Sequence, residues 1–238
     1  MVFIHGLSDN LLYWEYLASN LRHDHQVLRF DLRGHGQTEL GNDEISMDVY
    51  VDDLHDLLYE LDIDKVNLVG FSLGGAVALD FTVKYPKMVS SLVLMSSFYK
   101  ADGHLEHVLN QFREALKISF NEFYDLILPM VLCPDVIEDN KEELEMLKEI
   151  ASLSANNQAY IHAIDASLAF DIEVELSNID ASTLVLAGRH DAITSLESQK
   201  ELQRKIKNSK LIVFDDVRHN LLVGKNNEKI LNMLKKEM

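Results

Sequence analysis

The sequence predicts an α/β fold built on a mostly parallel, doubly wound sheet of about six strands. Three observations lead to this prediction. Short apolar runs rich in Val, Ile and Leu recur along the chain, and amphipathic segments with helical spacing separate them. The segment from about 100 to 170 has no strand-like run and consists of helical patterns. Small and chemically active residues directly follow several runs, where open parallel sheets bind ligands.

The elements follow from these patterns in chain order. The predicted strands are the runs at 2–5, 26–31, 65–70, 91–96, 183–188 and 211–215. Apolar spacing predicts core helices at 12–21, 46–61, 195–207 and 227–236, and another after residue 72. In 46–61 the expected buried stripe is Val49, Val51, Leu54, Leu57, Leu58 and Leu61. About four more helices are expected near 104–117, 120–132, 140–154 and 157–168. We therefore expect a core of residues 1–99 and 171–238 with a helical insertion at 100–170.

The stretch Gly70-Phe71-Ser72-Leu73-Gly74 lies between a predicted strand and a small-residue helix. A Gly-x-Ser-x-Gly turn in this context is typical of a nucleophile elbow, which exposes a serine hydroxyl on a strained backbone. The glycines two residues before and after Ser72 are needed because a side chain there would collide with the neighbouring backbone. Ser72 is therefore the candidate nucleophile.

A serine nucleophile needs a base and a carboxylate that orients the base. Asp191 follows the predicted strand at 183–188, and His219 follows the one at 211–215. Both lie at the same sheet edge as Ser72. Asp215 and Asp216 are rival acids, but they end the same strand as His219 and are badly placed to reach its ring. We predict Ser72, Asp191 and His219 as a catalytic triad.

Two further motifs complete a resemblance. His5-Gly6-Leu7 follows the first strand, and the stretch 31–36 (DLRGHG) follows the second. With the serine turn and the order Ser, Asp, His, these motifs resemble the α/β-hydrolase family, over the whole chain except about 100–170. The resemblance implies an oxyanion hole formed by the backbone N–H groups of Leu7 and Leu73. Family members usually carry two earlier strands, so we expect these to be missing or to lie upstream of Met1, leaving 26–31 as an edge strand.

In α/β-hydrolases a helical insertion at this position forms a lid over the active site, and the resemblance implies that role for 100–170. Its large apolar side chains should face the pocket or the lid's own core, with the core favoured for each: Phe112, Phe120, Phe123, Tyr124, Leu128 and Met130. The residues predicted to line the substrate pocket are His5, Phe71, Phe120, Phe123 and Leu128.

Other polar residues have simpler explanations. His190 is expected to be a loop residue, because adjacent side chains point in different directions. The clusters at 23–25 and 104–107 lack a third ligand in register, so no metal is expected. His5 and His35 are expected to make structural hydrogen bonds. The pair at Asp31 and Arg33 should brace its loop, as an ion pair or otherwise.

Composition limits the partners. The formal net charge of −17 over 238 residues excludes nucleic acid and anionic membranes as expected partners. No run approaches the ~18 apolar residues of a membrane span, and we expect no secretory signal. The single cysteine, Cys133, excludes an internal disulfide and is predicted to be a small buried hydrophobe. We expect a cytoplasmic protein without cofactor that acts on a small molecule; a homo-oligomer stays open.

The resemblance is nearest to small carboxylesterases and 3-oxoadipate enol-lactonases. It implies hydrolysis of a small to medium, fairly apolar carboxylic ester through an acyl-enzyme, with water as the second substrate. An enol-lactone or C–C bond hydrolase with the same triad is an alternative. An alternative of another class is a hydrolase-fold receptor or scaffold that binds a small ligand with negligible turnover.

Overall fold

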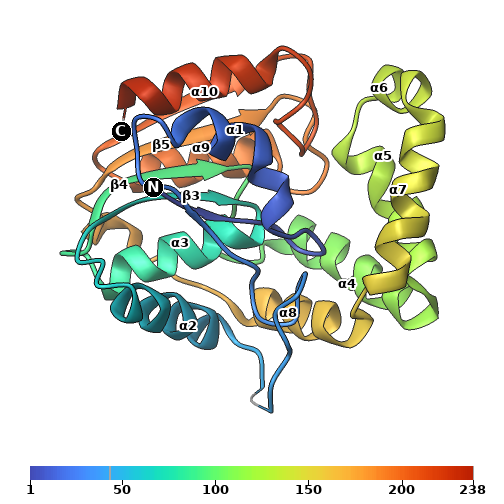
Figure 1. Ribbon diagram of the computed structural model, residues 1–238, viewed down its shortest axis with the longest axis horizontal. Helices are drawn as coiled ribbons and strands as arrows, with labels where there is room; N and C mark the ends of the chain where they lie inside the picture. The colour runs from blue at the N-terminus through green and yellow to red at the C-terminus, as the bar shows by residue number, and fades with distance from the viewer. Residues whose placement is uncertain (43, 238) are drawn as a thin grey trace.

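A six-stranded parallel sheet in the order β2-β1-β3-β4-β5-β6 forms the centre of the computed structural model, which describes residues 1–42 and 44–237 (Figure 1). All six predicted strands are present: β1 Val2–Ile4, β2 Leu28–Arg29, β3 Val66–Phe71, β4 Val89–Met95, β5 Ser182–Gly188 and β6 Ser209–Phe214. Every neighbouring pair is parallel. The predicted fold class is therefore confirmed, and the two-residue β2 lies at one edge, as expected.

Helices alternate with the strands outside the insertion. They are α1 Glu15–Leu21, preceded by the short helix η1 Leu11–Trp14, and α2 Met47–Glu60, α3 Leu73–Lys84, α9 Leu196–Lys205 and α10 Asn226–Glu237. The insertion between β4 and β5 contains α4 Gly103–Ile118, α5 Phe120–Val131, α6 Pro134–Asp139, α7 Lys141–Ser154 and α8 Asn157–Ala169, and the short helix η2 Leu176–Asn178 follows it. The sequence analysis did not predict α6, whose six residues are too few to show a helical period.

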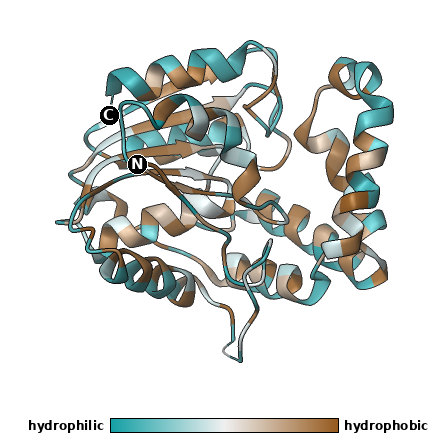
Figure 2. Cartoon of the chain, in the orientation of Figure 1, coloured by the Kyte–Doolittle hydropathy of each residue, from teal (hydrophilic) through white to brown (hydrophobic). Residues whose placement is uncertain are grey.

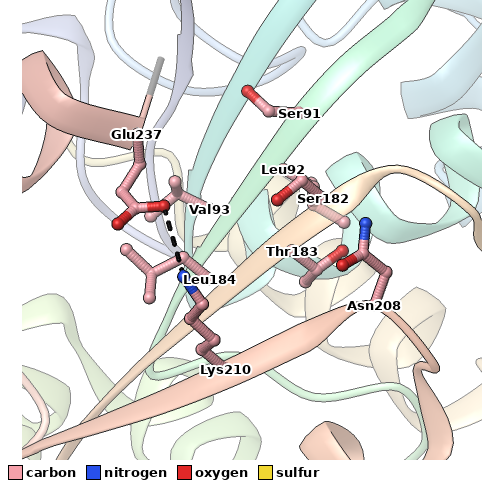
Figure 3. A pocket seen from close by; sticks show the side chains of 9 residues that line it. All are labelled: Ser91, Leu92, Val93, Ser182, Thr183, Leu184, Asn208, Lys210 and Glu237. Carbon is pink, nitrogen blue, oxygen red and sulfur yellow. Dashed lines mark ion pairs between the residues drawn. The ribbon is translucent and has the colours of Figure 1, made fainter.

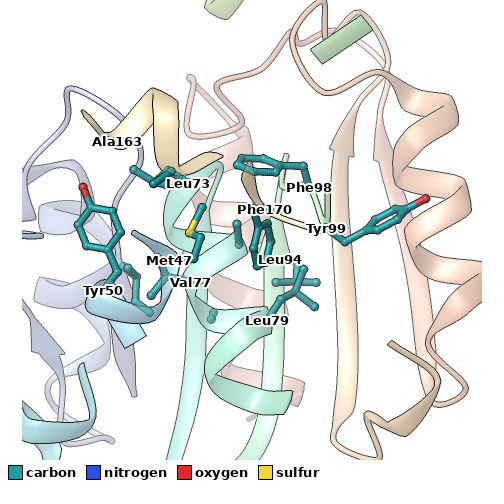
Figure 4. Close-up of a cluster of buried hydrophobic side chains, with 14 of the residues drawn as sticks. Met47, Tyr50, Leu73, Val77, Leu79, Leu94, Phe98, Tyr99, Ala163 and Phe170 are labelled. Atoms are coloured by element: carbon teal, nitrogen blue, oxygen red, sulfur yellow. The ribbon is translucent and has the colours of Figure 1, made fainter. Parts of the chain in front are cut away.

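The two faces of the sheet carry separate apolar clusters because successive strand residues point to opposite faces. In β4, Leu92 and Leu94 pack with α2, α3 and α9, whereas Val93 and Met95 pack with α1 and α10. Figure 4 shows the first cluster, where side chains of α2, α3, β4 and α8 meet. Figure 2 shows the apolar strands enclosed by helices with hydrophilic outer sides. This packing fixes the sheet edge that carries the predicted site residues.

One predicted stripe is only partly right. In α2 the buried residues are Met47, Tyr50, Val51, Leu54 and Leu58. Leu61 is 49% exposed, and Val49 and Leu57 are only half-buried. Val51, Leu54 and Leu58 are shared by the predicted and the observed stripe, and Met47 and Tyr50 extend it at the helix start. The helix itself begins one residue after its predicted start, where the Ser46 side chain accepts from the N–H of Val49.

The insertion divides into two parts. Helices α4 and α8 pack on the core and bury apolar residues, whereas α5, α6 and α7 extend to one side of the molecule (Figure 1). Helices α6 and α7 have no buried residues among those described. Four apolar side chains of α7 are exposed: Met146, Leu147, Ile150 and Leu153. In the part of the chain that the structure describes, no helix is both long and apolar enough to cross a membrane.

The two ends of the insertion lie together. Lys100 and Asp171 form an isolated antiparallel bridge. Glu173 pairs with Lys100 and, at 2.5 Å, with Lys205 of α9. The insertion therefore leaves and rejoins the core at one place.

Candidate active site

Ser72 occupies the turn between β3 and α3. Its backbone has φ 51° and ψ −117°, a conformation that costs energy for a residue with a side chain. A Cβ at Gly70 would lie 2.4 Å from the Gly74 carbonyl oxygen, and one at Gly74 would lie 2.2 Å from the Ile4 carbonyl oxygen. These contacts are with backbone atoms that cannot move aside, so both positions need glycine. The strand, helix and neighbouring strand together hold Ser72 in its strained conformation.

Hydrogen bonds fix the backbone of this turn. The Ser72 N–H donates to the Met95 carbonyl at 2.9 Å, and the Ser97 hydroxyl donates to the Ser72 carbonyl at 3.0 Å. Gly75 permits this approach, because a Cβ there would lie 2.4 Å from the Ser97 Oγ. The end of β4 therefore holds the serine turn in place.

Asp191 and His219 meet at the same edge of the sheet. Asp191 Oδ2 lies 2.8 Å from His219 Nδ1, and the two residues are 7% and 3% exposed. Asp191 follows β5 and His219 follows β6, as expected from the sequence. When His219 Nδ1 carries the proton and donates it in the hydrogen bond to Asp191, Nε2 of the neutral imidazole is the proton acceptor.

The Asp191 carboxylate is held by its own loop. Its Oδ1 accepts from the N–H groups of Ile193 and Thr194 at 2.8 and 2.9 Å. Its Oδ2 accepts from the Thr194 hydroxyl at 2.8 Å, beside the bond to His219. These donors hold both carboxylate oxygens and fix the plane of the carboxylate. The sequence analysis did not predict the part played by Thr194.

The His219 loop is positioned by contacts from other strands. The Ser96 hydroxyl donates to the His219 carbonyl at 2.8 Å, and Ser96 itself has a φ of 48°. The Phe71 ring lies 5.1 Å from the His219 ring between centroids. A Cβ at Gly188 would lie 1.9 Å from the Arg218 carbonyl oxygen, so only glycine lets this loop approach β5 so closely. Polar residues at the carboxyl end of β4 were a signal that could have identified Ser96 and Ser97.

Two backbone donors flank the serine. Leu73 is the first residue of α3, where a helix leaves its N–H without an intrahelical partner. Leu7 lies in the turn after β1. Within residues 1–42 and 44–237, neither N–H donates a hydrogen bond to another protein group. Both groups are thus available to a bound oxyanion.

His5 and His35 are buried neutral residues of the neighbouring loops. His5 Nδ1 is bonded to the Gly6 carbonyl at 2.8 Å, and His5 Nε2 accepts from the Leu32 N–H at 3.0 Å. Burial lowers the pKa of His5 to about 4 and the pKa of His35 to about 3. His35 Nδ1 is bonded to the Arg33 carbonyl at 3.1 Å, while its Nε2 is buried without a partner among the described residues. Both rings make the structural hydrogen bonds expected of them.

The other polar residues lie apart from the His219 ring. Asp31 accepts from the N–H groups of Leu11 and Gln37, and Arg33 pairs with Asp53 at 2.5 Å. Each therefore braces its loop, as expected. Asp215 is exposed and pairs with Arg189 at 2.5 Å, and Asp216 is exposed as well.

Two further residues occupy exposed or partly exposed positions. His190 is exposed, with its backbone N–H bonded to the Val217 carbonyl. Cys133 is only half-buried, contrary to the prediction, because it caps α6 where that helix meets the His219 loop.

The predicted pocket residues differ in burial. Phe71 is 5% exposed and stacks on Tyr13 with ring centroids 4.7 Å apart. Phe120 and Phe123 are 8% and 1% exposed and belong to the apolar core. Leu128 is half-buried. Of the larger aromatic set in the insertion, Phe112 packs edge-on against Phe123 with ring centroids 5.4 Å apart.

One acidic residue of this region was not singled out by the sequence analysis. Asp9 follows the His5-Gly6-Leu7 motif, and an added Cβ at Gly6 would meet its Oδ2 at 3.1 Å. Burial raises the pKa of Asp9 to about 7, although the His219 ring and the Gly6 N–H lower it. The sequence signal that could have identified Asp9 is its position two residues after Leu7 in the loop that follows the first strand.

The opposite edge of the sheet carries a small cavity that is unrelated to these residues. It lies at the amino ends of β4, β5 and β6 and has a volume of about 20 Å³, room for little more than one water (Figure 3). The Lys210–Glu237 ion pair, at 3.8 Å, borders it. Among the described residues, no group of three or more His, Cys, Asp or Glu side chains is arranged to hold a metal ion.

Comparison with known proteins identifies the family. The profile of the alpha/beta hydrolase fold matches residues 1–129, more than half of the 238-residue chain, and the profile of the TAP-like proteins matches residues 155–235. The chain belongs to the α/β-hydrolase fold family. The resemblance drawn from the sequence motifs is therefore confirmed.

Relatives of this α/β-hydrolase differ in how much of it they share. An uncharacterised protein of Mycobacterium tuberculosis is 37% identical over 133 residues, which are 56% of this chain. This match spans only 38% of the length of that relative. The AB hydrolase superfamily protein YisY of Bacillus subtilis is 28% identical over 229 residues, covering 92% of this chain and 84% of the relative.

Solved structures share the whole fold. The enol-lactonase from Burkholderia xenovorans superimposes with a TM-score of 0.89 at 20% identity, covering 99% of this chain and 89% of its own. An esterase from Exiguobacterium antarcticum gives a TM-score of 0.87 at 21% identity, covering 99% and 90%. At these identities the likeness establishes the fold of this α/β-hydrolase.

Proposed function

We propose that this α/β-hydrolase cleaves a small to medium, fairly apolar carboxylic ester through a covalent acyl-enzyme. Ser72 is the nucleophile, His219 the base and Asp191 the acid that orients it. The observation that carries the proposal is the Asp191–His219 hydrogen bond of 2.8 Å, which lies at the same sheet edge as the strained Ser72 turn. Membership of the family and the alignment with the AB hydrolase superfamily protein YisY support hydrolase activity.

The chemistry follows from the protonation state of His219. With its Nδ1 proton directed at Asp191, the ring takes the Ser72 hydroxyl proton at Nε2 while the serine oxygen attacks the carbonyl carbon. His219 then gives that proton to the leaving alcohol oxygen, and the ester C–O bond breaks. Water attacks the acyl-enzyme by the reverse route and releases the acid and the free serine. Asp191 stays ionised throughout and compensates the charge on the imidazolium.

The negative charge that develops on the carbonyl oxygen is held by the backbone N–H groups of Leu7 and Leu73. Their unused hydrogen-bonding capacity supports this role. Losing one such donor costs roughly 3–4 kcal/mol of transition-state stabilisation in enzymes where it has been measured. Because both donors are backbone groups on ordered elements, they need no reorganisation when the oxyanion forms.

A neutral substrate is supported by the cations of the insertion. Lys100, Arg113, Lys117 and Lys148 each pair with a carboxylate, and Lys141 is exposed at the start of α7. One of these paired cations could bind a dicarboxylic lactone only after its ion pair had been broken. Residues 100–170 act as a lid whose α5 reaches the His219 loop, where the Asn220 N–H donates to the Val131 carbonyl at 3.1 Å. A lid in that position sets the length of acyl chain that fits above the serine.

The test uses a fluorophosphonate probe and p-nitrophenyl butyrate. The wild-type protein should be labelled and should hydrolyse the ester, and Ser72→Ala should lose both while keeping its thermal unfolding transition. Ser90→Ala, at an exposed position of β4, serves as a matched serine control and should keep both. Undiminished hydrolysis by Ser72→Ala would refute the mechanism. Labelling without turnover of any ester would favour a receptor or scaffold.

A further inference from the structure

Asp9 is a carboxyl group in the active-site region that the mechanism above does not use. Ser8 has a φ of 59°, and this left-handed turn brings the Asp9 N–H to the Gly6 carbonyl at 3.3 Å. The turn folds the carboxyl back over the chain, so that Oδ2 and the Phe71 ring both lie against the Cα of Gly6. The Gly6–Leu7 peptide bond carries the Leu7 N–H. Asp9 therefore lies directly beside an oxyanion donor.

The surroundings of Asp9 are the aromatic groups of the site. The Phe71 ring that borders its carboxyl also contacts the His219 ring, at 5.1 Å between centroids. Burial raises the pKa of Tyr13 from η1 and of Tyr160 from α8, and the nearby charge of Asp9 adds to both shifts. Burial also raises the pKa of Asp9, and the His219 ring acts against that shift. The carboxyl thus faces groups from the core, from the insertion and from the catalytic loop.

No cation balances this carboxyl within residues 1–42 and 44–237. The other acid of the site, Asp191, is satisfied by four donors from its loop and His219. Within the described residues, Asp9 is supported by the Gly6 N–H and the His219 ring alone, and part of its surface stays exposed. A buried polar group usually has a partner, so a half-buried carboxyl with this little support is free to bond a ligand.

We infer that Asp9 is a specificity-determining residue that binds an N–H group of the substrate next to the scissile carbonyl. This inference rests on the proposed hydrolase function and narrows its substrate class. The preferred substrates are then neutral esters whose acyl part carries an amide-type N–H, such as N-acylamino esters. A site built to bond a donor discriminates strongly against an analogue that lacks it, because its polar group is left unpaired.

Ionisation of Asp9 should strengthen this preference. As a carboxylate, Asp9 accepts a hydrogen bond from the substrate N–H. With a substrate that has no donor, the negative charge of Asp9 gains no hydrogen bond and destabilises the oxyanion that develops beside Leu7. The charged and titratable groups that face it are His219, Tyr13 and Tyr160. With a pKa of about 7 for Asp9, the preference should rise as the pH passes from 6 to 8.

The experiment compares two esters that differ at one group. p-Nitrophenyl N-acetylglycinate has an N–H where p-nitrophenyl 4-oxopentanoate has a CH₂, and the ratio of their kcat/KM values measures recognition of the N–H. We expect Asp9→Asn to lower this ratio by roughly 10- to 100-fold and to make it independent of pH. Asp64→Asn, at an exposed position with no part in the site, is the matched control and should leave the ratio unchanged.

The outcomes separate this inference from the proposed function. If Asp9→Asn is labelled by the fluorophosphonate and its ratio equals that of the wild type, Asp9 does not determine specificity, while the hydrolase function stands. If Asp9→Asn loses both substrates equally, Asp9 supports the site in general and the inference is wrong. Asp9→Ser provides a second variant should the asparagine protein fail to fold. Failure of the wild-type protein to label would instead refute the hydrolase itself.

Discussion

The Asp191 carboxylate shows how single residues prepare this site. Ile193, Thr194 and His219 supply four hydrogen bonds to its two oxygens, and three of these bonds come from residues two or three positions away in the chain. The local loop therefore supplies most of the hydrogen bonds that fix the carboxylate. In the proposed mechanism this preorganisation matters because the acid must hold one imidazole tautomer during proton transfer.

Asp191→Asn should lower kcat by up to ~10⁴, since the amide NH₂ group next to Nδ1 would favour the wrong tautomer. Stability should change little, because an asparagine oxygen can still accept from the Ile193 and Thr194 N–H groups. The measurement is steady-state hydrolysis of p-nitrophenyl butyrate with thermal unfolding in parallel. Asp215→Asn is the control, since Asp215 pairs with Arg189 at the surface. A larger loss in Asp215→Asn would mean that the acid has been wrongly assigned.

At the scale of elements, the helix α5 illustrates why burial decides what a side chain can do. Phe123 is 1% exposed and packs against Phe112 and Phe120, with centroid distances of 5.4 and 6.0 Å. Leu128, one turn further along, is half-buried and lies outside the two apolar clusters. The first residue holds the insertion together, and the second is free to contact an acyl chain.

Truncating these two residues should therefore have different effects. Phe123→Ala should lower the free energy of unfolding by about 3–5 kcal/mol, as for buried aromatic side chains elsewhere. Leu128→Ala should cost much less and should raise kcat/KM for p-nitrophenyl esters longer than the wild-type optimum, with acetate little changed. Urea unfolding and a chain-length series from acetate to decanoate measure the two effects. An unaltered chain-length profile in Leu128→Ala would show that α5 does not line the pocket.

The sequence predicts strands and longer helices well because their signals are local. Continuous apolar runs identified all six strands, and helical spacing identified the four longer helices of the insertion. The position of Ser72, Asp191 and His219 at one sheet edge could be predicted because each lies in the loop after a strand. The supporting contacts could not be predicted, since Ser96 with His219 and Ser97 with Ser72 join residues that are 123 and 25 positions apart. The α2 stripe was partly wrong because Met47 and Tyr50, which share the helical period of Val51, Leu54 and Leu58, were left out of it.

For the molecule as a whole, the loops around the site couple its stability to pH. His5 and His35 stay neutral in the folded state, with pKa values of about 4 and 3, because burial disfavours their charged forms. In the unfolded chain each takes up a proton near pH 6.5. Asp9 acts in the opposite direction, because its folded pKa of about 7 lies above its unfolded value of 3.8.

The sign of the pH effect follows from counting protons. Between pH 6.5 and 4 the unfolded chain binds two more protons at His5 and His35, while the folded state binds one more at Asp9. Summed over these three groups, the unfolded state binds about one more proton than the folded state. The free energy of unfolding should therefore fall by about 1.4 kcal/mol per pH unit on acidification. Urea unfolding at pH 4.5 to 6.5 measures this slope.

His35→Gln removes one of the two histidine protons and should flatten the pH dependence of the free energy of unfolding, whereas Asp9→Asn should make it steeper. His23→Gln, at an exposed position, should reproduce the wild-type slope. Equal slopes in all four proteins would mean that these buried groups do not govern the pH response.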